Sequence, residues 1–473
     1  MFTDYSFLEP GAAWPPKNEL ERARLKRYGD NDALFDGRHE FVFREVWTRL
    51  FRRDPLMKMS VEMCLPWPKR LSTLWADLLI GETPGVSDAK NDELTQYLSD
   101  LVKRLNLWRA AYQAAIDSSR FGDAVLKVRR DDAGRTRVAV IHPSCWFPVV
   151  SETDSTEVVA HVLAWPTGEP EKGTGRLQVE IHEAGRVEYR VYDHSGGALN
   201  PAAGIGKLLD VHDEQTNVDS PLVVHIANMA TSGRLYGHDD YSDLTAILQE
   251  LEVRFAQNAR ILDKHADPKM FGPDYTRKDE ETGQTVADIG DYVPLDEGET
   301  PPGYIAWNAQ LDSSYKQIEE LMQQFYMLSE TSPAVFGDVK NGLAESGSAL
   351  KRLLMVPLAK VNRIRLDFDF GLKEVIRLAA LLDSGKAVKP VIAWKDGLPD
   401  DEAETVQVEA TAVAAGITSK LSAMKRAYGY DDKQAADEQK QIEKETPTIA
   451  EPVNFATKTD HTETDHNGDN GSA

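Results

Sequence analysis

The chain has 473 residues, enough for roughly two to four domains, and 41% of them are hydrophobic, which suffices for folded cores. Its formal net charge of -23 argues against a tight, sequence-reading DNA binder, because such a charge repels nucleic acid, yet it is compatible with a conduit through which DNA slides. No run of about 18 apolar residues occurs and the N-terminus lacks a basic region before an apolar core, so we expect neither a transmembrane helix nor a secretory signal. Two cysteines, Cys64 and Cys145, suit a reducing compartment and an interpretation as small buried hydrophobes.

The first part of the chain has helical periodicity. Residues 1–16 predict a poorly ordered arm, and Asn18–Arg27 predicts a charged surface helix. Phe41–Phe51 and Ser72–Pro84 add helical segments, and Asp92–Arg120 predicts one long amphipathic helix, because its leucines recur at helical spacing.

The apolar period then changes to that of strands. Turn signals such as Asp131–Gly134 and His194–Gly197 separate short alternating runs, which favours an antiparallel sheet and an α+β domain over the first 240 or so residues. The predicted strands are Ala124–Arg129, Val138–His142, Phe147–Ser151, Val158–Ala164, Leu177–His182, Val187–Tyr192 and Pro221–Ile226.

Two long helices are predicted next, over Asp243–Lys264 and Asp312–Leu328, on either side of a segment rich in Gly, Pro and acids. If they pack antiparallel, this segment projects from their far end. A glycine-punctuated loop, Glu330–Gly347, then leads into an apolar helix over Ser348–Leu382. Pro357 lacks a backbone donor and clashes with the preceding turn, so we expect a kink there.

The C-terminal part predicts a strand and an acidic turn over Val388–Glu404, then two short helices, Thr405–Ala427 and Asp431–Lys444. From Glu445 onward the polar, aromatic-poor composition is typical of a disordered tail.

Motifs of catalysis and cofactor binding are absent from the sequence. It contains no GxxxxGK[ST], HExxH, CxxC or GxSxG, and its SxxK matches at Ser348 and Ser422 are better explained as ordinary helix. Asp239 and Asp240, next to His238, either bind a divalent cation weakly or cap the helix that begins near Asp243, and capping is favoured. We therefore expect no catalytic residue, no cofactor and no metal.

The order of these elements resembles the portal protein of tailed bacteriophages, of the siphophage type, over roughly residues 40–445. The matching motifs are Leu235-Tyr236-Gly237 with Ser242-Asp243-Leu244, Thr331-Ser332-Pro333 with Phe336-Gly337, the Ser346–Lys351 run, and Trp394 with Leu398–Asp401. Each motif is weak alone, and their order and spacing carry the resemblance.

The resemblance implies a mainly helical portal fold with an α+β wing. Its parts would be an N-terminal arm (1–40), the wing (41–240), two stem helices (241–266 and 312–332) and a clip between them (267–311). A tunnel loop (333–347), a kinked tunnel helix (348–384), a crown (385–445) and a disordered tail (446–473) would follow.

It also implies a non-enzymatic ring, of usually about twelve subunits, at a capsid vertex. The ring would be the channel for DNA packaging and ejection. Implied partners are other copies of the chain, the terminase large subunit, a head-tail connector or adaptor, the major capsid protein and scaffold, and double-stranded DNA held without sequence preference; no membrane is implied. The protein would be assembled in the host cytoplasm and reside in the virion.

The site residues follow from this assignment. Lys340 and Asn341 would face DNA from the tunnel loop. The stem cations either line the channel or pair with Glu250, Glu252, Glu319 or Glu320 of a neighbouring subunit; they are Arg254, Arg260, Lys264 and Lys316. Acidic clip residues would meet a basic motor or adaptor surface; they are Asp279, Glu280, Glu281, Asp288, Asp291, Asp296, Glu297 and Glu299.

Two other classes of protein stay open at this point. One is another virion head component, which would form shells rather than a discrete ring. The other is a metal-dependent nuclease or hydrolase that uses acids of the α+β domain, with Asp239 and Asp240 as its first candidates.

Overall fold

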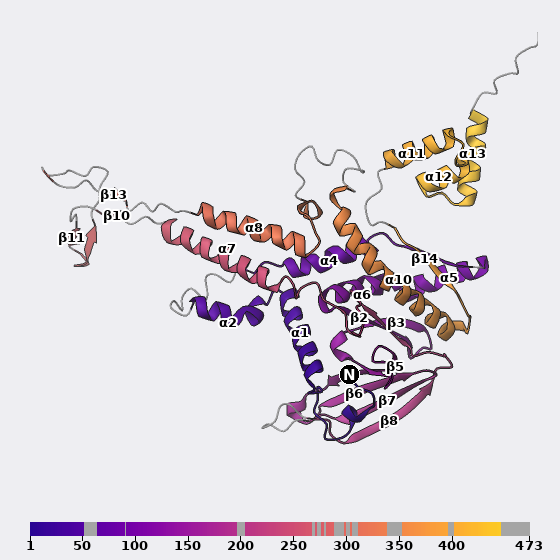
Figure 1. Cartoon of the computed structure of the whole chain (residues 1–473), viewed down its shortest axis with the longest axis horizontal. Helices are drawn as coiled ribbons and strands as arrows, with labels where there is room; N and C mark the ends of the chain where they lie inside the picture. The colour runs from indigo at the N-terminus through magenta and orange to yellow at the C-terminus, as the bar shows by residue number, and fades with distance from the viewer. Residues whose placement is uncertain are drawn as a thin grey trace, which may run out of the picture. The chain divides into compact units, whose positions relative to one another are not determined.

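The computed structural model describes residues 1–51, 64–89, 91–195, 204–266, 270–271, 276–278, 281–287, 298, 303–304, 311–337, 352–395 and 402–445. It divides into two units, Met1–Leu398 and Pro399–Ala473. Figure 1 shows the elements of each unit. None of the helices in the described ranges is long and apolar enough to cross a membrane.

Helices predominate at the start of the larger unit. They are η1 (Ser6–Leu8), α1 (Glu19–Phe35), α2 (His39–Phe51), α4 (Trp67–Ile80), α5 (Asp92–Leu105) and α6 (Leu107–Phe121). The long helix expected over Asp92–Arg120 is therefore two helices. Asn106 separates them in the left-handed conformation (φ 51°), which Asn tolerates better than most residues and which ends α5.

Two antiparallel sheets form the middle of this unit, as expected from the alternating pattern. The first has the order β3-β2-β9 and the second β4-β5-β6-β7-β8. The strands are β2 (Asp123–Arg130), β3 (Thr136–Ile141), β4 (Trp146–Val150), β5 (Val158–Thr167), β6 (Arg176–Glu183), β7 (Arg186–Asp193), β8 (Leu208–Gln215) and β9 (Val223–Ala227), with short 3-10 turns η2 (Pro143–Cys145) and η3 (Pro170–Lys172) between them.

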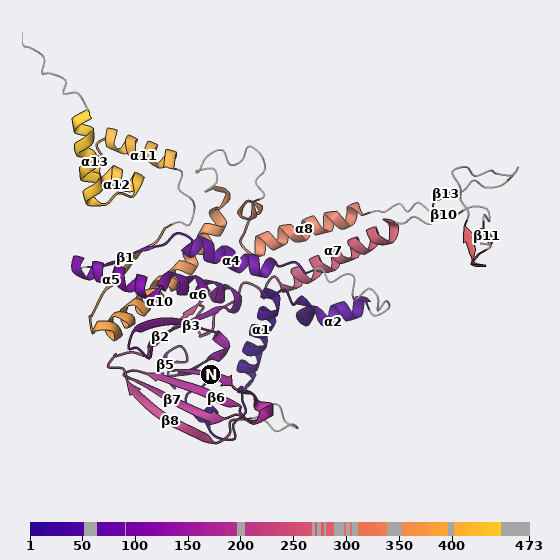
Figure 2. The same cartoon turned by 180° about the vertical axis from the view of Figure 1, so that it is seen from behind.

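Apolar side chains join the sheets to each other and to the helices. Val125 of β2 and Val223 of β9 pack with Trp146 of β4 and Leu163 of β5, so one core cluster lies between the two sheets. A larger core lies on the helical side, where α6 covers β2 and β3. Figure 2 shows the helices gathered on this side and the five-stranded sheet beyond them.

The first sixteen residues are ordered against the five-stranded sheet, so the expectation of a poorly ordered arm is wrong. Phe7, Leu8 and Trp14 are at most 8% exposed and pack with Phe147 of β4. Gly11 donates its backbone N–H to the Ile205 carbonyl at 2.7 Å. The physical reason is the aromatic content of this segment, whose burial outweighs the cost of ordering it.

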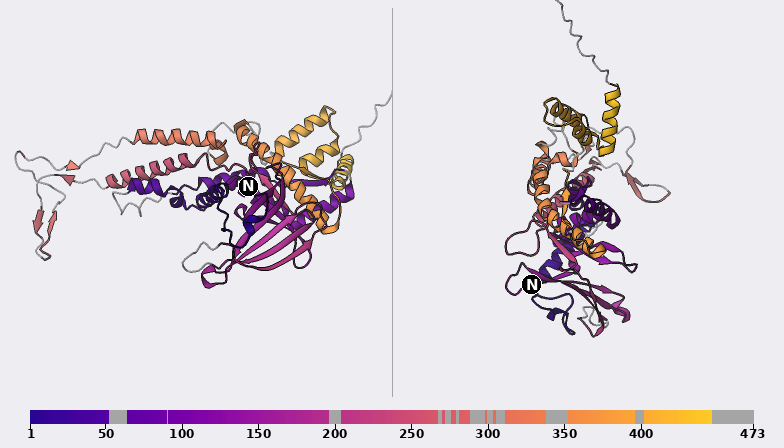
Figure 3. Two further views of the ribbon diagram at one scale, coloured as in Figure 1. Left: turned by 60° about the horizontal axis from the view of Figure 1, so that its bottom comes forward. Right: turned by 90° about the vertical axis from the view of Figure 1, so that its right-hand side faces the viewer.

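Two long helices follow, α7 (Thr245–Ala266) and α8 (Asp312–Leu328), and they lie side by side in Figures 1 and 3. Between them the described residues form two short strand pairs, β10 (Met270–Phe271) with β13 (Gly303–Tyr304) and β11 (Thr276–Lys278) with β12 (Thr285–Ala287).

The last elements of the larger unit are η4 (Pro333–Phe336), α10 (Met355–Ser384) and β14 (Pro390–Ala393). Within the helix expected from Ser348, Arg352 and Leu353 are helical, a turn at Leu354 interrupts the helix, and α10 begins at Met355. Pro357 lies in the first turn of α10, where a missing N–H costs no hydrogen bond. Strand β14 pairs antiparallel with β1 (Gly85–Asp88).

The smaller unit contains three described helices, α11 (Glu402–Ala414), α12 (Lys420–Tyr428) and α13 (Asp432–Glu445). The expectation of a single helix over Thr405–Ala427 is wrong, because the chain leaves the helical conformation at Gly416 (φ +69°) and Ser419 caps a new helix. Arg426 of α12 binds Glu409 of α11 through two nitrogens at 2.6 and 2.7 Å.

Candidate functional site at the helix pair

The helix pair is held together along a narrow buried face. On α7, Leu248, Leu251 and Ala256 are buried, and on α8 Ile318 and Phe325 are buried. Ser314 Oγ donates to Asn258 Oδ1 at 2.7 Å across the pair. The remaining surface combines polar side chains with the exposed apolar side chains of Leu262, Tyr315, Met327 and Leu328.

The predicted cations of the pair lie in different environments. Arg254 Nη2 lies 2.6 Å from Glu250 Oε1 one turn earlier on α7, so this ion pair forms within one chain. Arg260 of α7 and Lys316 of α8 have exposed side chains, and no ion pair of Lys316 occurs within the described ranges. Lys264 lies in the last turn of α7.

The acidic candidates that sequence analysis offered as partners also differ. Glu319 and Glu320 are exposed on α8. Glu252 is 1% exposed and pairs with His39 of the same chain, so the expectation that it is available to a neighbouring subunit is wrong.

Several predicted positions lie outside the described residues. They are Lys340 and Asn341 of the loop and Asp279, Glu280, Asp288, Asp291, Asp296, Glu297 and Glu299 of the insertion. Glu281 is described and exposed, in the turn between β11 and β12.

An aromatic cluster lies where α8 leads into η4. Phe325 of α8 lies 5.3 Å from Trp67 of α4 between ring centroids. Phe336 of η4 meets Trp67 edge-on at 5.5 Å and Tyr326 at 6.1 Å. The segment before the predicted loop is thereby anchored to α4, because aromatic pairs of this geometry stabilise beyond the area that they bury.

The start of α7 is fixed by the two aspartates considered as cation ligands. Asp239 Oδ1 accepts the backbone N–H of Tyr241 at 3.0 Å and of Ser242 at 2.7 Å, and Arg27 lies 3.4 Å from Asp239 Oδ2. Asp240 pairs with Lys360 of α10. Both carboxylates are therefore engaged in structural contacts, which removes the specific support for the nuclease alternative.

A buried polar network beneath this segment could not be found by motif. Asp123 of β2 accepts from the Tyr28 hydroxyl at 2.5 Å and from the Gly237 N–H at 2.9 Å, and it lies 2.7 Å from His225 Nε2. Burial and the Asp123 charge raise the pKa of Tyr28, so this hydroxyl stays protonated and donates. The predicted surface helix ended at Arg27, before Tyr28, and no sequence pattern indicated this contact.

Glu21 and Arg24 of α1 extend the network. Arg24 Nε donates to Glu21 Oε2 at 2.9 Å, and Arg24 also reaches the carbonyls of Pro143 and Trp146. The Tyr236 hydroxyl donates to Glu21 Oε1 at 2.9 Å. The helix expected to lie on the surface therefore places two ionised side chains in the interior.

These contacts explain the Leu235-Tyr236-Gly237 motif. A Cβ atom at Gly237 would lie 2.1 Å from the Gly122 carbonyl oxygen, so only glycine fits there. The motif holds the chain against β2 and β9 immediately before α7.

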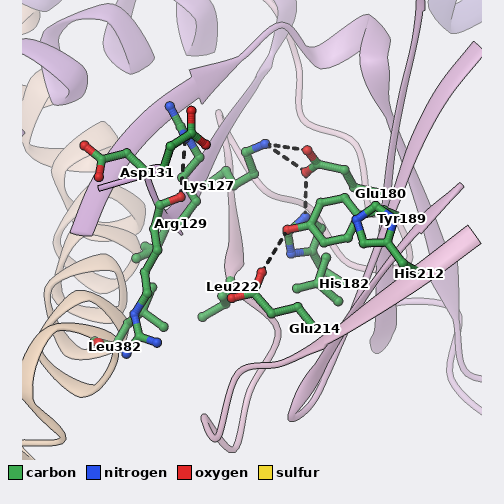
Figure 4. A pocket seen from close by; sticks show the side chains of 14 residues that line it. Lys127, Arg129, Asp131, Glu180, His182, Tyr189, His212, Glu214, Leu222 and Leu382 are labelled. Carbon is green, nitrogen blue, oxygen red and sulfur yellow. Dashed lines mark hydrogen bonds and ion pairs between the residues drawn. The ribbon is translucent and has the colours of Figure 1, made fainter. Parts of the chain in front are cut away.

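A cavity of about 730 Å³ lies between β2 and strands β6, β7 and β8 (Figure 4). Lys127 Nζ lies 2.8 Å from Glu180 Oε2, and His182 Nε2 lies 3.0 Å from the same oxygen. Lys127, Glu180 and His182 thus pair with one another at the cavity, and none of the predicted site residues lines it. This arrangement presents no free nucleophile paired with a base.

The chain belongs to the phage portal protein family. The family model described as "Phage portal protein, SPP1 Gp6-like" matches residues 17–451. No curated protein matches the sequence.

Three solved chains that are similar to this chain come from gene transfer agent (GTA) particles. A chain from the neck of an empty GTA particle is 14% identical, with 79% of this chain and 92% of that chain covered and a TM-score of 0.48. A chain from the virion of a native gene transfer agent particle is 12% identical, with 89% and 96% covered and a TM-score of 0.47. One from the neck of a native GTA particle is 15% identical, with 77% and 90% covered and a TM-score of 0.42.

Proposed function

We propose that the chain assembles into a closed ring, of about twelve subunits, that forms the DNA channel at one vertex of a phage-like capsid. The observation that carries the proposal, beside membership of the family, is an apolar stripe on α10. Met355, Leu366 and Phe370 are 66%, 73% and 78% exposed. Their spacing of eleven and four residues puts them on one face of the helix. Large apolar side chains exposed on one helix face are typical of a protein–protein contact, and a ring of copies would bury them.

In this ring the two long helices α7 and α8 would form the stem, and residues 267–311 between them the clip. Residues 41–240 would form the wing, with residues 1–40 as its N-terminal arm. The segment 333–347 would be the tunnel loop, 348–384 the tunnel helix, and 385–445 the crown, followed by the tail 446–473. The aromatic anchor at Phe336 supports this division, because it ties the base of the tunnel loop to the folded body.

A channel for DNA needs weak, non-specific contacts, because tight phosphate binding would stall movement. Lys340 and Asn341 would supply such contacts in the tunnel loop. Arg260 and Lys316, both exposed, would either line the channel or pair with a neighbouring subunit. Arg254 is a weaker candidate than Lys316, since Glu250 already neutralises it.

The clip would dock the terminase large subunit during packaging and a head-tail connector afterwards, through its acidic residues. The major capsid protein and scaffold would contact the ring at the vertex. Assembly would take place in the host cytoplasm, and the ring would remain in the virion. The role is structural, not enzymatic, which fits the engaged carboxylates of Asp239 and Asp240.

Electron microscopy of the purified protein tests the ring. End-on class averages should show closed rings with a central channel of at least about 20 Å, wide enough for duplex DNA. Shell-like particles would instead favour another head component, and a monodisperse monomer at high concentration would contradict self-assembly through α10.

The stripe itself is tested by Phe370→Asp. We expect rings to be lost while the monomer keeps its circular dichroism spectrum and thermal midpoint, because Phe370 is exposed. Val159→Asp is a matched control, since Val159 is 47% exposed on β5 in the five-stranded sheet. Rings that persist in the Phe370 variant would remove the stripe from the subunit interface.

The DNA contact is tested in assembled rings with Lys340→Ala, which should weaken non-specific DNA association and lower its salt dependence. Reversing the charge of Asp279, Glu280 and Glu281 tests the clip. Packaging and head completion that survive this reversal would rule out electrostatic docking there.

A further inference from the structure

We propose that His39, Cys64 and Glu252 form a structural metal site of the zinc class, which fastens α2 to α7. The ligand atoms of the three side chains, one nitrogen, one sulfur and one carboxylate oxygen, all lie within 4.8 Å of one another. They come from three separate parts of the chain: the first turn of α2, the segment before α4, and the middle of α7.

The imidazole is oriented as a metal ligand requires. His39 Nε2 lies 2.9 Å from the Leu34 carbonyl oxygen, so it carries the proton and donates. This leaves Nδ1 to face Glu252 and Cys64. A backbone acceptor on the second nitrogen is the usual outer partner of a metal-bound histidine, because it fixes the tautomer and the ring.

The Glu252 carboxylate can still form a bond to a metal ion. Glu252 Oε1 contacts His39 Nδ1 and accepts the backbone N–H of Leu65 at 3.0 Å. Glu252 Oε2 is buried and has no hydrogen-bond partner among the described residues. A buried carboxylate oxygen without a partner is costly, and a bound cation would satisfy it.

Local backbone geometry brings the thiol to the other two groups. Gly37 ends the turn after α1 with φ +76°, and a Cβ atom built there would lie 3.4 Å from Cys64 Sγ. The turn therefore places His39 beside Cys64 and leaves room for the sulfur. Cys64 is partly exposed, whereas His39 and Glu252 are buried, so an ion can enter from the cysteine side.

The three donor atoms, one sulfur, one nitrogen and one oxygen, indicate which metal would bind. Zn²⁺ binds sulfur at about 2.3 Å and nitrogen or oxygen at about 2.0–2.2 Å, in tetrahedral geometry, and three protein ligands leave one position for water. Thiolate with imidazole favours Zn²⁺ over Ca²⁺ or Mg²⁺. The charges also balance, since a divalent ion with one thiolate, one carboxylate and one neutral imidazole is neutral overall.

Metal binding displaces protons from the ligand side chains. The Cys64 S–H and any proton on His39 Nδ1 leave to solvent as the metal–sulfur and metal–nitrogen bonds form. Affinity should therefore fall as the pH is lowered. Sequence motifs could not find this site, because 213 residues separate His39 from Glu252 and no short ligand spacing exists.

The test uses the full chain, purified without a histidine tag, stripped with a chelator and titrated with Co²⁺. We expect a thiolate-to-cobalt charge-transfer band and tetrahedral d–d bands that saturate at one equivalent, and Zn²⁺ should displace them. A chain that gives neither band, and takes up no Zn²⁺ from a chromogenic chelator, would overturn the proposal.

Variants separate the site from other metal-binding groups. Cys64→Ser should abolish the charge-transfer band, while Cys145→Ser, the matched control at the other free cysteine, should leave it unchanged. Glu252→Gln keeps the shape of the side chain and should weaken binding at least about 100-fold, since even outer partners of a metal contribute 10- to 100-fold. A band that persists in the Cys64 variant, or disappears with Cys145, would contradict the assignment; this readout does not depend on ring assembly.

Discussion

Lys360 Nζ lies 2.9 Å from Asp240 Oδ1, and each side chain is at most 8% exposed. The ammonium also lies 4.5 Å from the centroid of the Trp75 ring. This buried pair joins α10 to the residues that begin α7, and α4 supplies the aromatic face. One ion pair thus links α10 to the segment that leads into α7.

We predict that Lys360→Met destabilises the protein by about 3–5 kcal/mol, because it leaves the Asp240 carboxylate buried without its cation. Chemical denaturation followed by circular dichroism measures the change. The double variant Lys360→Met, Asp240→Asn should recover part of the loss, since no charge is then buried. Equal losses in the single and double variants would show that packing, rather than charge, dominates.

Stability should fall in acid through His161. This residue is buried on β5 and accepts from Trp146 Nε1 at 3.0 Å, so it is neutral in the fold. Burial, then the nearby His225 and His182, lower the pKa of His161 from 6.5 to about 3. Below pH 6.5 the unfolded chain takes up a proton that the folded chain refuses, so unfolding becomes easier until about pH 3.

The expected slope from His161 is at most about 1.4 kcal/mol per pH unit in that window. His161→Gln keeps an acceptor for Trp146 and should flatten the dependence by this amount relative to the parent protein. Parallel pH profiles of the two proteins would contradict the assignment of His161 as a source of acid sensitivity.

Gly237→Ala should destabilise the larger unit severely or prevent folding. The added Cβ would lie 2.1 Å from one backbone oxygen and 2.6 Å from another, those of Gly122 and Asn228, and neither can move freely. Thermal unfolding and soluble yield measure the effect. Gly29→Ala is the matched control: Gly29 lies within α1 with open space around it, so alanine there should stabilise by up to about 1 kcal/mol.

Arg254→Ala should change the free energy of unfolding by no more than about 0.5 kcal/mol, because its partner Glu250 lies one turn away on a partly exposed helix face. Denaturant titration checks this. A much larger loss of stability would mean that Arg254 supports the packing of the helix pair. An Arg254 variant could then not be used to test the channel, because it would also disturb the fold.

Much of the fold follows from periodicity. Seven of the strands were predicted from runs of alternating apolar residues, and the range of α8 agrees with the helix expected over Asp312–Leu328. Strand β8 was missed because every residue from Leu208 to Gln215 is exposed, so no apolar face marks it. It is a strand because β7 pairs with it.

The interior polar groups were harder to predict. Glu21 and Arg24 appear as ordinary surface charges in sequence, and only the tertiary structure brings Tyr236 and two carbonyls to them. The cluster of His39, Cys64 and Glu252 is hidden for the same reason. A contact between two polar residues that are far apart in the chain produces no periodic pattern, so periodicity cannot predict it.

The pairing of β1 with β14 joins Gly85 to Ala393, which lies close to the C-terminal end of the larger unit. During synthesis, α5 and the sheets can form early, but this last ladder cannot close before Ala393 has left the ribosome. Completion of the larger unit is thereby coupled to synthesis of β14, and a truncated product ending within α10 would leave the β1 edge open to other strands.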